Sequence, residues 1–193
     1  YKGSSVAIMM PNILQYPICT FGILKAGLIV ENINPLYTER ELETQLLDSK
    51  SETIIILENF AYLIEKIAHK TLIKNIIITT VGELLGTKGL LINFVLRNIK
   101  KMIPKYNIDH SYKFINTIKT NDKYNFKKVS SNLEDIAFLQ YTGGTSGTIK
   151  AAMLTHKNIL SNVLQVKEWL GHHLKYGEDT AICALPLYHI FAL

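Results

Sequence analysis

The sequence has very few cysteines, and this scarcity excludes several classes of protein. Only Cys19 and Cys183 occur among the 193 residues. Two cysteines cannot form the disulfide framework of a small secreted domain, nor a zinc site built from four thiolates. Both have apolar neighbours, so we expect two buried, unpaired thiols in a reducing, cytoplasmic environment.

The sequence also lacks a long unbroken apolar run. Residues 3–24 carry no charge, but Pro11, Asn12, Gln15 and Pro17 interrupt them. A buried strand followed by a helix explains this stretch better than a membrane-spanning helix. We identify no basic leader with a small-residue cleavage site, so the sequence predicts no targeting signal.

The composition argues against a disordered chain. Hydrophobic residues make up 48% of the sequence and charged residues 19%, which is typical of a globular α/β protein. The formal net charge of +5 favours anionic partners such as nucleotides or acidic lipid. We expect no nucleic-acid partner, because the basic segments contain no recognisable recognition module.

What the sequence does have is a regular alternation of apolar strands and amphipathic helices. Apolar, mostly β-branched runs predict buried strands at residues 5–10, 28–30, 53–57 and 75–79. Such alternation predicts an α/β fold, with a layered, mostly parallel sheet and crossover helices.

Three helices are predicted between these strands. The first is capped by Asn12 and ends at Gly27, with Pro17 marking a kink or a late start. The second begins with a capping box formed by Thr38 and Glu41. The third covers residues 59–70. The residues expected on the inner faces of the second and third helices are Leu42, Leu46 and Leu47, and Leu63, Ile64 and Ile67.

The alternation breaks down between residues 82 and 128. A helix is predicted at 89–105, where Leu91, Phe94, Val95, Ile99 and Met102 share one face among several basic residues. A basic amphipathic helix can lie on an anionic membrane surface. The alternative is an ordinary surface helix whose apolar side packs inward. Residues 107–128 are expected to be a polar surface excursion.

Further elements are predicted towards the end of the sequence. A helix capped by Thr155 should follow residues 153–155, and a strand is expected at 181–185. The last residues form the apolar run 190–193, and we therefore expect a piece of a larger protein. The helix is expected to pack inward through Ile159, Leu160, Val163, Leu164 and Val166.

The strongest candidate for a functional site is the glycine-rich stretch 140–150. It follows the apolar run 136–139 and contains three glycines, four serine or threonine side chains and Lys150. Glycines let backbone N–H groups converge on an anion, hydroxyls donate hydrogen bonds, and a lysine adds a mobile positive charge. This composition indicates a loop that wraps the phosphates of ATP.

Familiar phosphate-binding motifs do not match this stretch. A Walker A loop has glycine before its lysine and serine or threonine after it, whereas Ile149 and Ala151 flank Lys150. The glycine spacing also differs from the dinucleotide fingerprint. The partner motifs of a protein kinase are not found in the sequence.

The stretch resembles the signature loop of the adenylate-forming superfamily. Residues 141–147, Lys150 and residues 153–156 are most similar to the long-chain fatty acyl-CoA synthetases of bacteria. Two further stretches match that family in the same order, residues 22–27 with 34–38, and residues 185–191. The resemblance thus extends over nearly the whole chain and implies a partial N-terminal AMP-binding domain at residues 1–193.

The resemblance implies a reaction in two steps. A fatty carboxylate attacks the α-phosphorus of Mg²⁺-bound ATP to form an acyl-adenylate and pyrophosphate, and the thiol of coenzyme A then displaces AMP. It implies a fatty acid, ATP and coenzyme A as substrates and Mg²⁺ as cofactor, with no metal ligand assigned. A peripheral position on the inner face of the cell membrane remains open, as does the oligomeric state.

The resemblance also implies roles for particular residues. Lys150 and His189 are the expected catalytic residues, and Tyr188, His189 and Phe191 are expected to line the pocket for the acyl chain. The expected nucleotide-binding residues are Tyr141, Thr142, Gly143, Gly144, Thr145, Ser146, Gly147, Thr148, Ile149, Lys150, Ala151 and Ala152.

The sequence departs from the family in two respects. Ala151 stands where the family usually has glycine, and its Cβ is harmful only if that position needs a positive φ angle. The adenine, ribose and C-terminal lysine motifs of the family are not found. We therefore expect this chain alone to be inactive. The alternative to a ligase is a truncated module that binds nucleotide or lipid without turnover.

Overall fold

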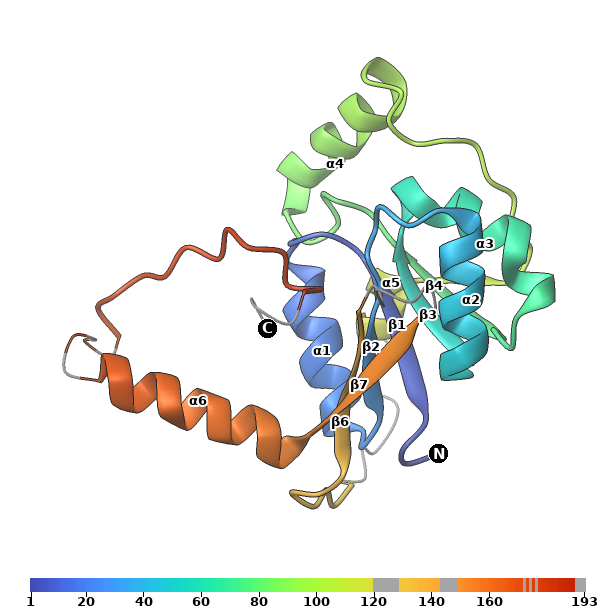
Figure 1. Ribbon diagram of the computed structural model, residues 1–193. Helices are drawn as coiled ribbons and strands as arrows, with labels where there is room; N and C mark the ends of the chain where they lie inside the picture. The colour runs from blue at the N-terminus through green and yellow to red at the C-terminus, as the bar shows by residue number, and fades with distance from the viewer. Residues whose placement is uncertain (120–128, 143–148, 172, 174, 176, 190–193) are drawn as a thin grey trace.

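The computed structural model describes residues 1–119, 129–142, 149–171, 173, 175 and 177–189 (Figure 1). These residues form a seven-stranded sheet in the order β5-β4-β3-β1-β2-β6-β7, parallel except for the antiparallel pair β6 and β7. The predicted α/β fold is confirmed. The strands are β1 (Ser5–Met9), β2 (Ile29–Asn32), β3 (Thr53–Leu57), β4 (Asn75–Thr79), β5 (Ser111–Lys113), β6 (Ile136–Thr142) and β7 (Lys150–Thr155).

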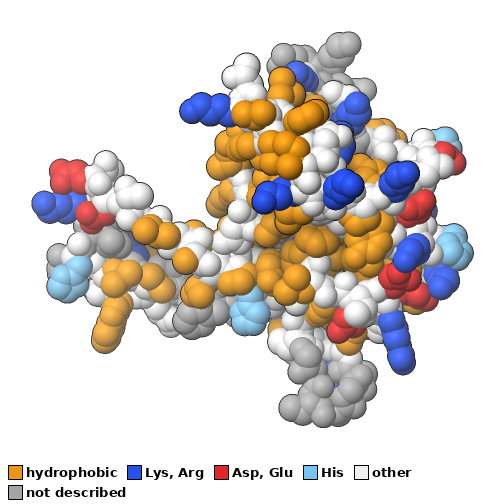
Figure 2. Space-filling model, turned by 90° about the horizontal axis from the view of Figure 1, so that it is seen from above, with side chains coloured by type: hydrophobic (Ala, Val, Ile, Leu, Met, Phe, Trp, Pro, Cys, Tyr) orange, Lys and Arg blue, Asp and Glu red, His pale blue; other side chains and the backbone are white. Residues whose placement is uncertain are grey.

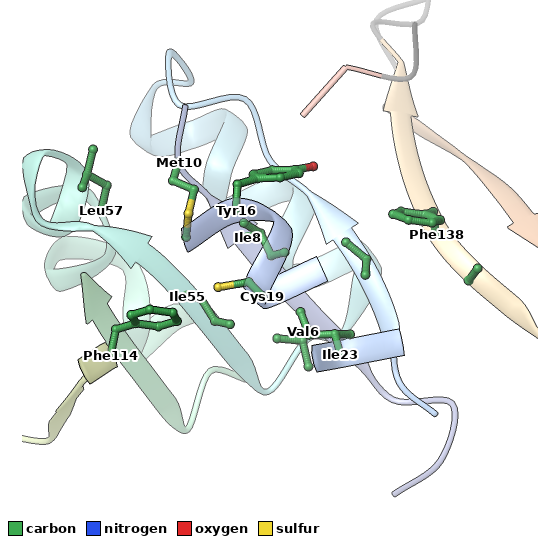
Figure 3. Close-up of a cluster of buried hydrophobic side chains, with 12 residues drawn as sticks. Val6, Ile8, Met10, Tyr16, Cys19, Ile23, Ile55, Leu57, Phe114 and Phe138 are labelled. Carbon is green, nitrogen blue, oxygen red and sulfur yellow. The ribbon is translucent and has the colours of Figure 1, made fainter. Parts of the chain in front are cut away.

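Helices cover both faces of the sheet around its central strand β1. Alternate side chains of a strand point to opposite faces. Val6 and Ile8 accordingly pack with one core cluster that includes α1 (Figure 3), whereas Ala7 and Met9 pack with α2 and α3 on the other face. The helices are α1 (Gln15–Lys25), α2 (Glu39–Ser49), α3 (Ala61–Ile67), α4 (Gly86–Phe94), α5 (Phe114–Lys119) and α6 (His156–Leu170).

Helix α1 begins later than its predicted cap. Leu14 occupies the N-cap position without a side-chain cap, so the prediction of Asn12 as cap is wrong. Pro17 lies in the first turn, where its missing N–H is not needed, and the late start is therefore the correct alternative. Gly27 follows the helix with a φ of +71°, as expected of a glycine that ends a helix.

Helices α2 and α3 largely confirm their predictions. Thr38 and Glu41 form the capping box, with the Glu41 N–H donating to Thr38 Oγ1 and the Thr38 N–H donating to Glu41 Oε2. Leu47 is 45% exposed, contrary to the prediction, because it lies 100° around the helix from the buried Leu46. The three predicted α3 residues are buried, and 3₁₀ turns η1 (Glu58–Phe60) and η2 (Ala68–Lys70) extend that helix at both ends.

Helix α4 continues as a π-helical turn, η3 (Val95–Ile99), so the helix occupies 86–99 rather than 89–105. Gly82 and Gly89 touch so closely that a Cβ on either would overlap the other's backbone, which fixes the start of α4 against the preceding turn. Leu91, Phe94 and Ile99 are each more than half exposed. The alternative of an apolar side packed inward is therefore wrong for these residues.

The end of the described chain differs most from expectation. Thr155 caps α6 as predicted, through a capping box with Asn158. The helix projects away from the sheet (Figure 1), and of its predicted inner face only Ile159 packs against the core. The prediction is wrong for four residues, because no described element covers them; these are Leu160, Val163, Leu164 and Val166.

The two cysteines have different environments. Cys19 is buried as predicted, and burial raises its pKa to about 12, which keeps it a neutral thiol. Cys183 is exposed, because the strand predicted at 181–185 does not form and the segment lies on the surface. Within the described residues, no helix combines the length and the apolar character needed to cross a membrane.

Candidate active site

A cavity of about 370 Å³ lies where β2 and β6 end at the same edge of the sheet. Ligand sites of parallel α/β sheets typically lie outside the carboxyl ends of the strands. Thr142 ends β6, and Tyr188 and His189 reach the cavity from the last described segment. The lining residues are Asn32, Asn34, Tyr37, Gln140, Tyr141, Thr142, Tyr188 and His189.

The glycine-rich loop is carried by the hairpin of β6 and β7. Thr142 pairs with Lys150 and Tyr141 pairs with Ala151, so the two stems of the loop lie side by side. Lys150 is exposed at the start of β7 and pairs with Thr142, which lines the cavity. The predicted contacts of Gly143, Gly144, Thr145, Ser146, Gly147 and Thr148 lie outside the described residues.

The other predicted loop residues belong to the second stem. Ile149 is partly exposed immediately before β7, and Ala151 and Ala152 are within the strand. Ala151 is therefore extended, and it is not among the non-glycine residues with positive φ. Its Cβ causes no backbone strain here, which resolves the question raised by the missing glycine.

Tyr141 anchors the first stem to helix α2. Its ring is buried, and its hydroxyl donates a hydrogen bond of 2.6 Å to Asp48 Oδ2. Burial and, next, this donation to a carboxylate raise the pKa of Tyr141, so the phenol keeps its proton. Tyr141 thus holds the start of the loop as a neutral hydrogen-bond donor.

The segment that carries His189 is held by side chains instead of a strand partner. Asn12 Nδ2 donates to the carbonyl oxygens of Cys183 (3.1 Å) and Leu185 (2.7 Å). Gln140 Nε2 donates to the Tyr188 carbonyl oxygen at 3.1 Å. These contacts place Tyr188 and His189 at the cavity, together with Thr142. Phe191, the third predicted pocket residue, lies outside the described residues.

Sequence reasoning missed the amide side chains of the site. Asn32 is buried in β2, and its Nδ2 donates to Gln140 Oε1 at 3.2 Å. The predicted strand ended at residue 30, so Asn32 was not placed at its carboxyl end. A signal was available, because Asn32, Asn34 and Gln140 are polar residues at or just after the ends of apolar strands.

Seven of the eight lining residues carry an amide or hydroxyl group, which can form hydrogen bonds with a polar ligand. The exposed Lys150 pairs with Thr142 across the hairpin. Among the described residues no cluster of three His, Cys, Asp or Glu side chains is arranged to hold a metal ion.

A second cavity, of about 460 Å³, lies beneath α4 and contains none of the predicted site residues. It is lined in part by Glu58, whose carboxylate accepts a hydrogen bond from Arg97. Burial raises the pKa of Glu58, and Arg97 opposes that rise. We regard the smaller cavity as the candidate active site because the two predicted stretches meet there.

Comparison with known proteins identifies the family of the chain. The family model described as "AMP-binding enzyme" matches residues 1–193. Long-chain-fatty-acid–CoA ligases from Salmonella typhimurium and Yersinia pestis are 51% and 49% identical to the chain over all 193 residues. The chain spans about a third of their length, 34% in each case.

A solved structure shows the same fold. The crystal structure of a long-chain-fatty-acid–CoA ligase from Archaeoglobus fulgidus matches with a TM-score of 0.70 and 26% identity. The match covers 99% of this chain and 32% of that one. The whole described sheet is therefore an arrangement found in this group of enzymes.

Proposed function

The chain belongs to the family of AMP-binding enzymes, and from that membership we propose that it is part of the N-terminal domain of a long-chain-fatty-acid–CoA ligase. The observation that carries the proposal is the meeting of Thr142 and His189 at one cavity, beside the stem residue Lys150. These residues are far apart in the sequence and come from the two motifs expected to handle the nucleotide and the acyl group.

The proposed reaction begins with Mg–ATP and a fatty acid as substrates. The fatty carboxylate is already an anionic nucleophile, so its attack on the α-phosphorus needs no protein base. Negative charge then develops on the departing pyrophosphate. The loop's N–H groups and hydroxyls, together with Lys150, would stabilise that charge in the transition state. The thiol of coenzyme A then attacks the acyl carbon of the adenylate, and AMP leaves.

In this proposal the two residues of the last segment have separate roles. The exposed His189 side chain would contact the acyl carboxylate or the adenylate at the mouth of the cavity. Tyr188 is partly buried against the core and would form a wall for the alkyl chain. Lys150 would contact the phosphates from the opposite stem.

A panel of carboxylic acids tests the proposal with the full-length protein. Pyrophosphate release should depend on a long-chain fatty acid and should be weak with aryl acids and amino acids. Release with an aryl or amino acid alone would contradict the proposed substrate class. Binding of ATP without release for any acid would favour a module that binds without turnover.

We also propose that α4 and η3 contact the inner face of the cell membrane. Their exposed apolar residues include Leu90, Leu91 and Phe94, and Figure 2 shows hydrophobic side chains gathered on this side with Lys and Arg around them. Residues 84–108 contain no Asp or Glu. The basic residues of this stretch are Lys88, Arg97, Lys100, Lys101 and Lys105.

Vesicle sedimentation tests the membrane contact. The protein should sediment with vesicles that contain an anionic lipid, and less so with neutral vesicles or at high salt. Leu91→Glu should abolish sedimentation, whereas Leu164→Glu, an equally exposed site on α6, should leave it unchanged. Equal loss in both variants would contradict a specific role for α4.

A further inference from the structure

Asn12 lies far from the glycine-rich loop in sequence, yet among the described residues the hydrogen-bond partners of its side chain all lie in the segment that carries His189. Besides the two bonds that its Nδ2 donates, its Oδ1 accepts a bond of 2.8 Å from the Leu187 N–H. The side chain therefore uses both donor hydrogens and its acceptor on one stretch of backbone. In the described chain, residues 181–189 have no strand neighbour, and Asn12 supplies the contacts that a strand would give.

Tyr16 extends this contact into the core. Its hydroxyl lies 2.8 Å from the Leu187 carbonyl oxygen and 2.6 Å from Asn32 Oδ1, and its single proton serves one of them at a time. The ring is 2% exposed and packs in the cluster of α1 and β1 (Figure 3). Burial raises the pKa of Tyr16, so the hydroxyl remains protonated.

The amide groups of β2 and β6 complete the connection. Asn32 donates to Gln140, and Gln140 donates to the Tyr188 carbonyl oxygen. Asn32 and Gln140 are at most 5% exposed. Residues 183–188, of which 183–186 are exposed, are thus tied to Asn12 and to the core elements α1 and β6.

We propose that Asn12 is a positioning residue, which sets the distance between His189 and the loop stem at Thr142. This inference rests on the proposed function of the site. Asn12 does not line the cavity, so its effect on catalysis must pass through the segment that it holds. Because small displacements of a catalytic group can reduce rates by roughly 10²-fold, we expect a loss of that size in kcat for Asn12→Ala, with a small change in KM for ATP.

A double-mutant cycle with His189 separates positioning from general stabilisation. Asn12→Ala and His189→Ala should each lower the rate of pyrophosphate release in the full-length protein. In the His189→Ala background, Asn12→Ala should cost about twofold or less, because independent sites add and coupled sites do not. Additive losses would overturn the proposal.

Two further variants test whether the effect is specific to this contact. Asn12→Asp keeps the oxygen that accepts from Leu187 but loses both donated bonds, and it should also lose activity. Asn59→Ala is the matched control, because that amide also donates a long-range bond to a backbone carbonyl, Met102 O at 3.1 Å, but outside the candidate site. Asn59→Ala should retain full activity. A loss in Asn59→Ala equal to that in Asn12→Ala would overturn the assignment.

Amide hydrogen exchange tests the contact even if the enzyme proves to have another activity. Asn12→Ala should speed exchange at the Leu187 N–H, with the melting temperature nearly unchanged and exchange in β1 and β3 unaltered. Unchanged exchange at Leu187 would overturn the positioning role. Faster exchange in a protein that activates no fatty acid would instead reject the proposed function and keep the contact.

Discussion

Apolar side chains are buried around the middle of the sheet but exposed on the helix that follows β7. Around β1 and β3 both faces are covered, and Ile54 and Ile56 are fully buried. Along α6, Leu164 is 62% exposed and Trp169 is 83% exposed. An amphipathic pattern identifies the apolar face of a helix, but burial also needs a covering element, which the described chain supplies for the first region only.

We call the region around β1 and β3, where both faces of the sheet are covered, the closed region. The largest expected effect comes from removing a buried side chain there. Ile54→Ala in β3 should lower the free energy of unfolding of the chain by about 2–5 kcal/mol, because a cavity adds to the lost burial. Leu164→Ala in α6 should change it by less than about 0.5 kcal/mol. Urea denaturation measures both, and equal losses would show that α6 is packed in solution.

A second prediction concerns Glu31, the buried carboxyl group of the closed region. It accepts hydrogen bonds from Ser51 (2.5 Å) and Gln45 (2.9 Å), but burial outweighs them and raises its pKa. At a pH above the ordinary pKa of a glutamate, Glu31 therefore keeps its proton in the folded state and loses it in the unfolded state. The resulting stability is present at low pH and is lost as pH rises through the folded pKa.

Substitution isolates this contribution. Glu31→Gln keeps the volume and cannot ionise, so it should flatten the fall in stability above about pH 4, the ordinary pKa region of a glutamate. It should make the protein more stable at neutral pH than the unsubstituted chain. Denaturation at several pH values provides the measurement, and an unchanged pH dependence would show that Glu31 does not hold the proton.

The smallest expected effect is the loss of a helix cap. It can be compared between the two regions because α2 and α6 both begin with a capping box. Thr38→Ala removes the cap of α2 and should destabilise the chain by about 1 kcal/mol. Thr155→Ala removes the matching cap of α6, and it should reduce helix content without an equal loss in global stability. Circular dichroism measures the helix content of each variant, and denaturation measures its global stability. Equal losses of global stability in both variants would contradict a difference between the regions.

The sequence predicted the closed region well for physical reasons. Apolar strands such as residues 53–57 and the capping box of Thr38 are local signals, and their burial follows from neighbouring elements. The prediction was poorest where contacts are long-range. The local pattern predicts a helix cap at Asn12, because its partners, residues 183–187, lie about 170 positions away.

The candidate site was predicted in part. The resemblance identified the loop and the segment of His189, and the structure brings Thr142, Tyr188 and His189 to one cavity. The sequence shows Asn32 and Gln140 as polar residues beside apolar strands, but it does not predict the contact between them, because that contact depends on β2 and β6 being neighbours in the sheet. The roles of Lys150 and His189 stay predictions.

The most direct test of the proposed activity is ATP–pyrophosphate exchange that depends on a long-chain fatty acid, measured with the full-length protein. We expect exchange in the unsubstituted protein and a loss of roughly 10²–10³-fold in Lys150→Ala, the usual effect of removing one group that stabilises transition-state charge. Lys157→Ala, on α6 beside Glu134, should stay within about twofold. No exchange in the unsubstituted protein, or full exchange in Lys150→Ala, would contradict the account.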